Sequence, residues 1–190
     1  MKFIRTAIPD VVIIEPTVFG DDRGYFVETF RQDKLDEFLG FKINFIQDNE
    51  SKSGVEVLRG LHYQLAPAAQ TKLVRVIKGK VLDVAVDIRR GSPTFGQHVS
   101  VELSEQNKTQ LLVPRGFAHG FVVLEDDTVF AYKVDNYYSP VNDRGIAFDD
   151  PALNINWVVS KEALKLSAKD TQQLDLAKAE VFDSEQDLYV

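Results

Sequence analysis

The sequence contains no cysteine, so disulfides, thiolate metal sites and cysteine nucleophiles are all excluded. Basic residues are also in deficit, because 22 Lys and Arg stand against 29 Asp and Glu, for a net charge of −7. This charge argues against nucleic acid and anionic membranes as partners, and an anionic ligand then needs a local basic pocket. The apolar stretch that ends at Ile14 is far shorter than a membrane span. These absences predict a soluble cytoplasmic protein with neither nucleic acid nor membrane as a partner.

Several catalytic motifs are missing as well. Neither G-x-G-x-x-G nor G-x-x-x-x-G-K occurs, which argues against redox chemistry on a nicotinamide, and no G-x-S-x-G elbow for a serine nucleophile is present. The groups that remain are His, Tyr, Lys and Arg on predicted strands. That set suits proton transfer next to a carbonyl group.

Turn signals recur about every ten residues between Ile43 and Phe148, a spacing typical of an all-β sandwich or barrel. We therefore expect one domain over residues 1–190, with its β core at about 43–148. A helix is predicted over Arg31–Leu39, where Gly40 provides a stop. Helical character returns in a C-terminal segment at about 160–182.

Two predicted strands flank Lys78-Gly79, and we interpret them as a hairpin of Lys72–Ile77 with Lys80–Ile88. The second strand places Leu82, Val84, Val86 and Ile88 on one face. Val81, Asp83, Ala85 and Asp87 lie on the other face. We expect Asp83 to form a salt bridge with Lys72 or Arg75 across the hairpin, because an unpaired buried charge is costly.

The stretch from Val57 to Gln64 is an apolar strand pattern that a cation, a glycine and an imidazole interrupt. Alternation places Arg59 on one face, and His62 and Gln64 on the other. With an unperturbed pKa of roughly 6.5, His62 is the most accessible proton acceptor in the chain. The alternative for a strand histidine is a hydrogen-bonded core residue.

The pair His62 and Gln64, with His119 after Pro114-Arg115-Gly116, resembles the two halves of a cupin metal site in which glutamine replaces one histidine. Two imidazoles and an amide are a thin ligand set for a transition metal. The resemblance implies a cupin-like jelly roll, a double-stranded β-helix, whose site performs organic chemistry without a metal or other cofactor. A metal-dependent cupin with these three ligands remains an alternative.

Five motifs, in order between about Ile8 and Asp170, together resemble the dTDP-4-dehydrorhamnose 3,5-epimerase family. They are R-G-Y-F at 23–26, F-I-Q-D-N at 45–49, L-R-G-L-H-Y-Q at 58–64, P-R-G-F-A-H-G-F at 114–121 and L-S-A-K-D at 166–170. The resemblance implies a cofactor-free jelly-roll homodimer in dTDP-L-rhamnose biosynthesis. Its substrate would be dTDP-4-dehydro-6-deoxy-D-glucose, which is inverted at carbons 3 and 5 beside the ketone.

The resemblance also implies roles for single residues. His62 would be the base, with Asp170 orienting its ring; Tyr132 would be the acid and Lys72 would stabilise the enolate. The implied substrate-binding residues are Arg23 and Arg59 at the diphosphate, Glu28, Gln47, Asp48, Asn49 and Asp143 toward the nucleotide, and His119 and Lys169 in the pocket. Seen singly, Tyr132 is a half-buried strand tyrosine, and Lys72 and Arg59 are solvated cations.

Two departures from the family pattern occur: Asp143 replaces the usual Glu and Phe148 the usual Trp, and the segment after Asp170 lacks its usual proline. Two further alternatives stay open. One is an epimerase that inverts a single carbon, and the other is a non-catalytic module that binds nucleotide sugars.

Overall fold

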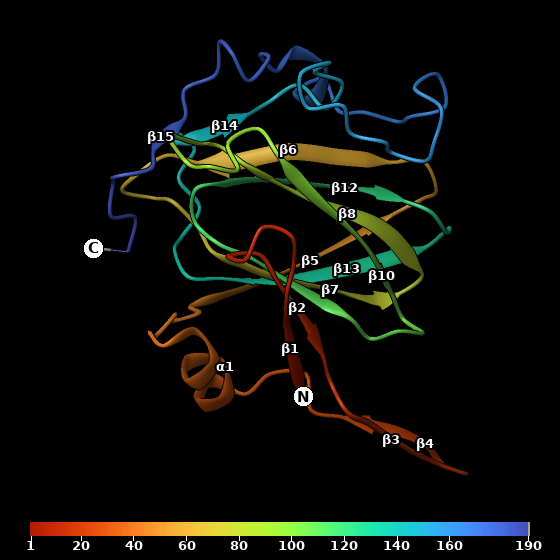
Figure 1. Ribbon diagram of the computed structural model, residues 1–190. Helices are drawn as coiled ribbons and strands as arrows, with labels where there is room; N and C mark the ends of the chain where they lie inside the picture. Colours follow the sequence, from red (N-terminus) through yellow and green to blue (C-terminus); the bar gives the residue numbers. More distant parts are fainter. Residues whose placement is uncertain (190) are drawn as a thin grey trace.

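The computed structural model describes residues 1–189, and two antiparallel sheets account for most of its strands. The six-stranded sheet has the order β1-β2-β11-β7-β13-β5, with β1 Lys2–Arg5, β2 Val12–Glu15, β11 Gln110–Val113, β7 Lys72–Lys78, β13 Thr128–Val134 and β5 Gln47–Ser53. The five-stranded sheet has the order β10-β8-β12-β6-β14, with β10 His98–Ser104, β8 Lys80–Asp87, β12 Phe117–Val123, β6 Leu58–Gln64 and β14 Asp143–Gly145. Figure 1 shows one sheet lying over the other. The predicted all-β jelly roll is confirmed.

Smaller elements surround the two sheets. Strands β3 Val18–Asp21 and β4 Gly24–Val27 form a separate hairpin that projects away from the sandwich (Figure 1). A short parallel pair joins β9 Arg89–Arg90 to β15 Phe182–Asp183. No helix in the part of the chain described here combines the length and the apolar character needed to cross a membrane.

The predicted helix is confirmed as α1, Gln32–Leu39. Its end follows from Gly40, which adopts φ 82° and donates its backbone N–H to Asp36 O at 2.9 Å. Helices commonly end at a residue with positive φ, and glycine adopts that conformation without steric cost. Leu35 is the buried residue of α1 and packs with Val12 and Ile14 of β2.

Besides the cluster around Leu35, the core has two larger layers, one on each face of the five-stranded sheet. Val81 and Ala85 of β8 face the interior between the sheets, where they pack with residues such as Phe121 and Phe130. Val84 and Val86 face outward and are covered by the C-terminal segment. The predicted alternation along β8 is confirmed, and both faces of the strand are buried.

The predicted hairpin of β7 with β8 is wrong, because these strands belong to different sheets. Strand β7 pairs with β11 and β13, whereas β8 pairs with β10 and β12. The chain turns the corner at Gly79, which has φ 80° and lies so close to Thr128 that a Cβ would come within 2.3 Å of its Oγ1. A Lys-Gly turn signal is common to a hairpin and to a corner between sheets, so it did not distinguish them.

The predicted C-terminal helical segment at about 160–182 is also wrong. It consists of turns, a single 3₁₀ turn η1 at Asp170–Gln172, and the start of β15. Backbone bonds tie it to the sandwich: Leu58 N–H donates to Lys165 O at 3.1 Å and Ala147 N–H to Leu174 O at 2.9 Å. Its apolar side chains, including Leu176 and Phe182, cover the outer face of the five-stranded sheet. The apolar residues whose spacing indicated a helix instead pack against this sheet without forming a helix.

Candidate active site

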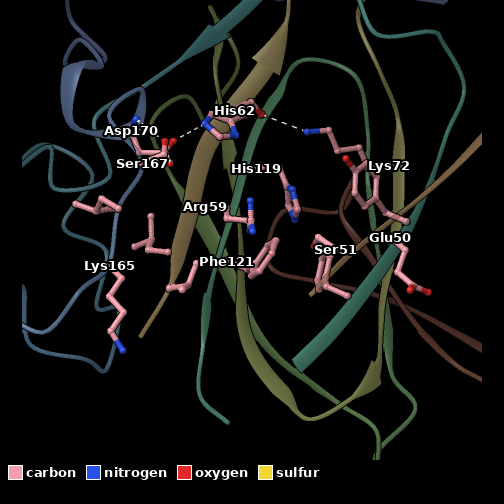
Figure 2. A pocket seen from close by; sticks show the side chains of 15 residues that line it. Glu50, Ser51, Arg59, His62, Lys72, His119, Phe121, Lys165, Ser167 and Asp170 are labelled. Atoms are coloured by element: carbon pink, nitrogen blue, oxygen red, sulfur yellow. Dashed lines mark hydrogen bonds and ion pairs between the residues drawn. The ribbon is translucent and has the colours of Figure 1, made fainter. Parts of the chain in front are cut away.

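A cavity of about 450 Å³ opens between the two sheets. Its walls come from β5, β6, β7, β12, β13 and the segment at 165–170. Six residues predicted from the sequence line it together: Arg59, His62, Lys72, His119, Tyr132 and Asp170. Several of these side chains converge from both sides of the cavity in Figure 2.

A bulge in β6 places Arg59 and His62 on the same wall. Pairing with β12 aligns His62 with His119 and Arg59 with Phe121, so two residues of β6 oppose Gly120 alone. Gly60 permits this close approach: its φ is 138°, and a Cβ would lie 2.5 Å from Gly120 Cα. The prediction that strand alternation separates Arg59 from His62 is therefore wrong.

His62 and Asp170 form a hydrogen-bonded pair, with 2.5 Å between His62 Nε2 and Asp170 Oδ1 (Figure 2). The Asp170 side chain is only 3% exposed, while that of His62 is 30% exposed. Burial alone raises the pKa of Asp170, but hydrogen bonds from His62 and Ser167 outweigh it and hold that pKa below its usual range. Asp170 is thus an ionised, acceptor-only group beside the imidazole.

Lys72 and Tyr132 contribute groups from neighbouring strands of the six-stranded sheet. Lys72 Nζ donates to His62 O at 3.4 Å. Burial lowers the pKa of Lys72 to about 8, although the charges of Asp83 and Asp143 oppose this effect. Burial raises the pKa of Tyr132, against the charge of Arg59. At neutral pH the cavity therefore presents an ammonium group and a protonated phenol.

Asp83 was missed as a site residue, and its predicted salt bridge to Lys72 or Arg75 is wrong. Its two carboxylate oxygens lie 3.0 and 2.9 Å from His119 Nε2, and its side chain is fully buried. The alternation along β8 had already put Asp83 on the inner face with Val81 and Ala85. That position was the signal for a buried partner, but the choice of partner depended on how β8 pairs with β12.

Gln64 has a structural role that the cupin comparison did not indicate. Its amide nitrogen donates to Ala68 O at 2.7 Å and to Tyr137 O at 3.2 Å, and its oxygen accepts from Ser139 N–H at 2.6 Å. It is buried beneath the loops and does not line the cavity with His62 and His119. Within residues 1–189, no cluster of three or more His, Cys, Asp or Glu is arranged to hold a metal ion.

The predicted binding residues of β5, at positions 47–49, do not line the main cavity. Gln47 donates to Asn49 Oδ1 at 2.8 Å, and Lys133 donates to Asp48 Oδ1 at 2.8 Å. Asp48 and Asn49 line an adjoining cavity of about 290 Å³, and Tyr132 lines both cavities. Among the predicted site residues, Tyr132 is therefore the one that lines both cavities.

Asp143 and Lys169 form an ion pair outside the main cavity, and the Tyr138 hydroxyl donates to Asp143 at 3.0 Å. Arg23 pairs with Asp21 in the β3–β4 hairpin. Glu28 follows that hairpin and lies 3.7 Å from Arg31. Neither Arg23 nor Glu28 lines the main cavity.

One family model, described as dTDP-4-dehydrorhamnose 3,5-epimerase, matches residues 5–178. The chain belongs to the dTDP-4-dehydrorhamnose 3,5-epimerase family. The resemblance that the five motifs carry is thereby confirmed.

Several known proteins are similar to this chain over most of its length. The Shigella flexneri dTDP-4-dehydrorhamnose 3,5-epimerase is 54% identical, with 96% of this chain and 99% of that protein covered. A Legionella pneumophila epimerase, solved in complex with dTDP-4-keto-L-rhamnose, has a TM-score of 0.93 and 46% identity, covering 97% of this chain and 99% of the other. A 3'-monoepimerase from Streptomyces bikiniensis, solved with dTDP-quinovose, has a TM-score of 0.86 at 32% identity, covering 90% and 86%.

Proposed function

We propose that this chain is an isomerase that inverts carbons 3 and 5 of dTDP-4-dehydro-6-deoxy-D-glucose, which gives dTDP-4-dehydro-L-rhamnose for dTDP-L-rhamnose biosynthesis. Membership of the 3,5-epimerase family supports the reaction. The observation that carries the mechanism is the pair of His62 and Asp170 in the wall of a cavity that Lys72 and Tyr132 also line. Hydrogens next to a ketone are acidic, and these groups are suited to moving them.

His62 is the base. Because the ionised carboxylate of Asp170 can only accept, His62 Nε2 carries the proton, and the lone pair of Nδ1 is free. The substrate proton passes from carbon to Nδ1, and the C–H electron pair forms the enolate double bond as the carbonyl pair moves onto oxygen. The resulting imidazolium is stabilised by Asp170.

Tyr132 is the acid on the opposite face of the sugar. Its raised pKa keeps the phenol protonated at neutral pH. It delivers a proton to the carbon, the enolate electrons re-form the ketone, and the imidazolium and phenolate recover their starting states by proton exchange with solvent. The same cycle then acts at the second carbon.

Lys72 stabilises the charge that forms on the carbonyl oxygen. With a pKa of about 8 it remains a cation at neutral pH, and a cation in a partly buried site interacts more strongly with an enolate than it would in water. His119 lies beside His62 on the wall formed by the five-stranded sheet, and its ring is held by Asp83. We propose that no metal or other cofactor takes part, so dialysis against a chelator should leave kcat unchanged.

Arg59 is the proposed ligand of the diphosphate. Ser53 Oγ accepts from its Nε at 3.2 Å and from its Nη2 at 3.0 Å, which leaves other guanidinium donors for phosphate oxygens. Together with Lys72 and Lys165 it provides positive charge at the cavity of an otherwise acidic chain. Gln47, Asp48, Asn49, Asp143, His119 and Lys169 complete the proposed substrate-binding set.

Arg23 and Glu28 belong to the same set only if a second copy of the chain is present. They lie on or next to the β3–β4 hairpin, which projects from the sandwich and exposes Phe19 and Phe26 to 62% and 68%. Phe19 and Phe26 are paired across the hairpin, and adjoining exposed apolar side chains of this kind are typical of contact surfaces. We infer a homodimer in which the hairpin contacts the partner and brings Arg23 to the partner's substrate. A cytoplasmic location, which suits a chain without cysteine, belongs to the same proposal.

The second candidate function is inversion at one carbon only. The likeness to a 3'-monoepimerase supports this candidate, because an enzyme described as acting at one carbon has the same fold as this chain. Product analysis separates the two candidates. Inversion at carbon 3 alone would give a product that differs from dTDP-4-dehydro-L-rhamnose at carbon 5, and inversion at carbon 5 alone would give one that differs at carbon 3.

The test is to incubate purified protein with dTDP-4-dehydro-6-deoxy-D-glucose and to identify the product by NMR. We expect dTDP-4-dehydro-L-rhamnose, and we expect His62→Ala to lower kcat by about 100-fold or more. His98→Ala is the matched control, since His98 lies on β10 and does not line the cavity. Binding of dTDP without conversion by the wild type would indicate a binding module, and retained activity in His62→Ala would contradict the mechanism.

A further inference from the structure

The hydroxyl of Ser167 makes two hydrogen bonds to one residue, Asp170. Ser167 Oγ donates to Asp170 Oδ2 at 2.6 Å, and the backbone N–H of Asp170 donates to Ser167 Oγ at 3.2 Å. One side chain thus fixes both the main chain and the carboxylate of Asp170.

The two oxygens of that carboxylate have separate partners. Oδ1 meets His62 Nε2 at 2.5 Å, and Oδ2 accepts from Ser167 (Figure 2). The Asp170 side chain is almost completely buried, so little water is available to replace a lost donor. Rotation of the carboxylate about its Cβ–Cγ bond would break both hydrogen bonds at once.

The local sequence explains why Ser167 stands in this place. Ser-Ala-Lys-Asp has the S-x-x-acid spacing of a capping box, and the backbone N–H of Thr171 donates to Ser167 O at 3.3 Å. In the usual box the acid reaches back to the N-cap backbone N–H, whereas here it accepts from the serine hydroxyl. Just before this turn, Lys165 makes backbone hydrogen bonds to Leu58 and Glu56. The backbone is therefore fixed two residues before Ser167, and the hydrogen bond from the Ser167 hydroxyl holds the Asp170 carboxylate relative to that fixed backbone.

We propose that Ser167 is a positioning residue for the reaction: its hydroxyl holds the Asp170 carboxylate, and through it the imidazole of His62, in the orientation that proton transfer requires. This inference rests on the proposed function for its effect on turnover. Its geometric part concerns only the free enzyme.

Three variants test it. Ser167→Ala removes the hydroxyl, while Ser167→Thr keeps it and adds a methyl group at an exposed residue. Ser160→Ala is the matched control, because it makes the same substitution in the same C-terminal segment at an exposed side chain that does not line the cavity. Three quantities are measured for each variant: kcat and KM with the keto sugar, and the exchange of the His62 ring N–H with water. The exchange is followed by ¹⁵N NMR in the absence of substrate, and the signal is assigned with His62→Ala.

We expect Ser167→Ala to lower kcat about tenfold with KM nearly unchanged, a loss of the size expected for a hydrogen bond to a charged group. The His62 N–H signal should broaden through faster exchange. Ser167→Thr should retain the wild-type kcat and exchange rate, since threonine keeps the hydroxyl that bonds to Asp170, and Ser160→Ala should behave as the wild type.

Unchanged kcat and unchanged exchange in Ser167→Ala would overturn the proposal. A lower kcat with an unaltered His62 signal would overturn it too, because Ser167 would then act elsewhere. If the wild type does not epimerise the sugar but its His62 signal responds to Ser167→Ala, the proposed function fails and the positioning role stands.

Discussion

Replacing Lys72 by methionine is expected to make the protein more stable while inactivating it. Burial lowers the pKa of Lys72 from 10.5 to about 8, so the folded state holds this proton less tightly than the unfolded state does. At about 1.4 kcal/mol per pH unit, the charged form costs about 3 kcal/mol at neutral pH. Methionine removes that cost and keeps much of the apolar stem.

Two terms reduce the expected gain. Lys72 is partly exposed, so solvent lowers the cost of its charge. The variant also loses the hydrogen bond from Nζ to His62 O, a contact of 3.4 Å that contributes about 1 kcal/mol. We therefore expect Lys72→Met to raise the free energy of unfolding by about 1–2 kcal/mol at pH 7.

The gain should depend on pH in a defined direction. Below pH 8 the folded and unfolded states both carry the charge, and the full cost is present. Between pH 8 and 10.5 the unfolded state binds more protons, so the stability contributed by this site in the wild type rises with pH. The advantage of the variant should therefore shrink and largely vanish near pH 10.

Urea unfolding at pH 7 and pH 10, at one protein concentration, measures this difference. Lys133→Met is the control, because Lys133 pairs with Asp48 at the surface and its loss should change stability by about 0.5 kcal/mol or less. The kcat of Lys72→Met should fall about 100-fold. The reasoning is refuted if the variant is less stable at pH 7, or if its advantage is the same at both pH values.

Two further predictions concern the frame of the site. Gly60→Ala should lower the free energy of unfolding, measured in urea, by about 3 kcal/mol or more, because φ is 138° and the new Cβ would lie 2.5 Å from Gly120 Cα. Gly20→Ala is the control and should show a much smaller loss, because its new Cβ would meet only one atom, at 3.6 Å. Arg115→Ala should cost about 3–5 kcal/mol, because it leaves the buried carboxylate of Asp135, now 3.1 Å from Arg115 Nε, without its cation. Adding Asp135→Asn should recover part of that loss, and an equal loss in the double variant would contradict the assignment.

Local patterns in the sequence predicted the local structure well. The helix at Gln32–Leu39 followed from apolar spacing and the glycine stop, and the alternation along β8 correctly divided its side chains between two faces. The residues that line the cavity were predicted from the family resemblance, because no local sequence pattern identifies such a set. Arg59, His62 and Lys72 meet there because of sheet pairing.

The errors arose where distant segments decide the structure. Strand alternation failed at Gly60, since a bulge depends on the close approach of Gly120 in another strand. The pairing of Asp83 with His119 follows from the alignment of β8 with β12, which no local pattern encodes. The segment after residue 160 has helical spacing, but its apolar side chains are used to cover a sheet.

The central claim is that His62 and Tyr132 move protons at two carbons of the sugar, and the most direct measurement is deuterium incorporation from heavy water. We expect the wild type to place solvent deuterium at both carbon 3 and carbon 5. We expect Tyr132→Phe to continue exchange through His62 while its product formation falls about 100-fold. Product that forms in heavy water without deuterium at either carbon, or exchange in His62→Ala at the wild-type rate, would contradict the account.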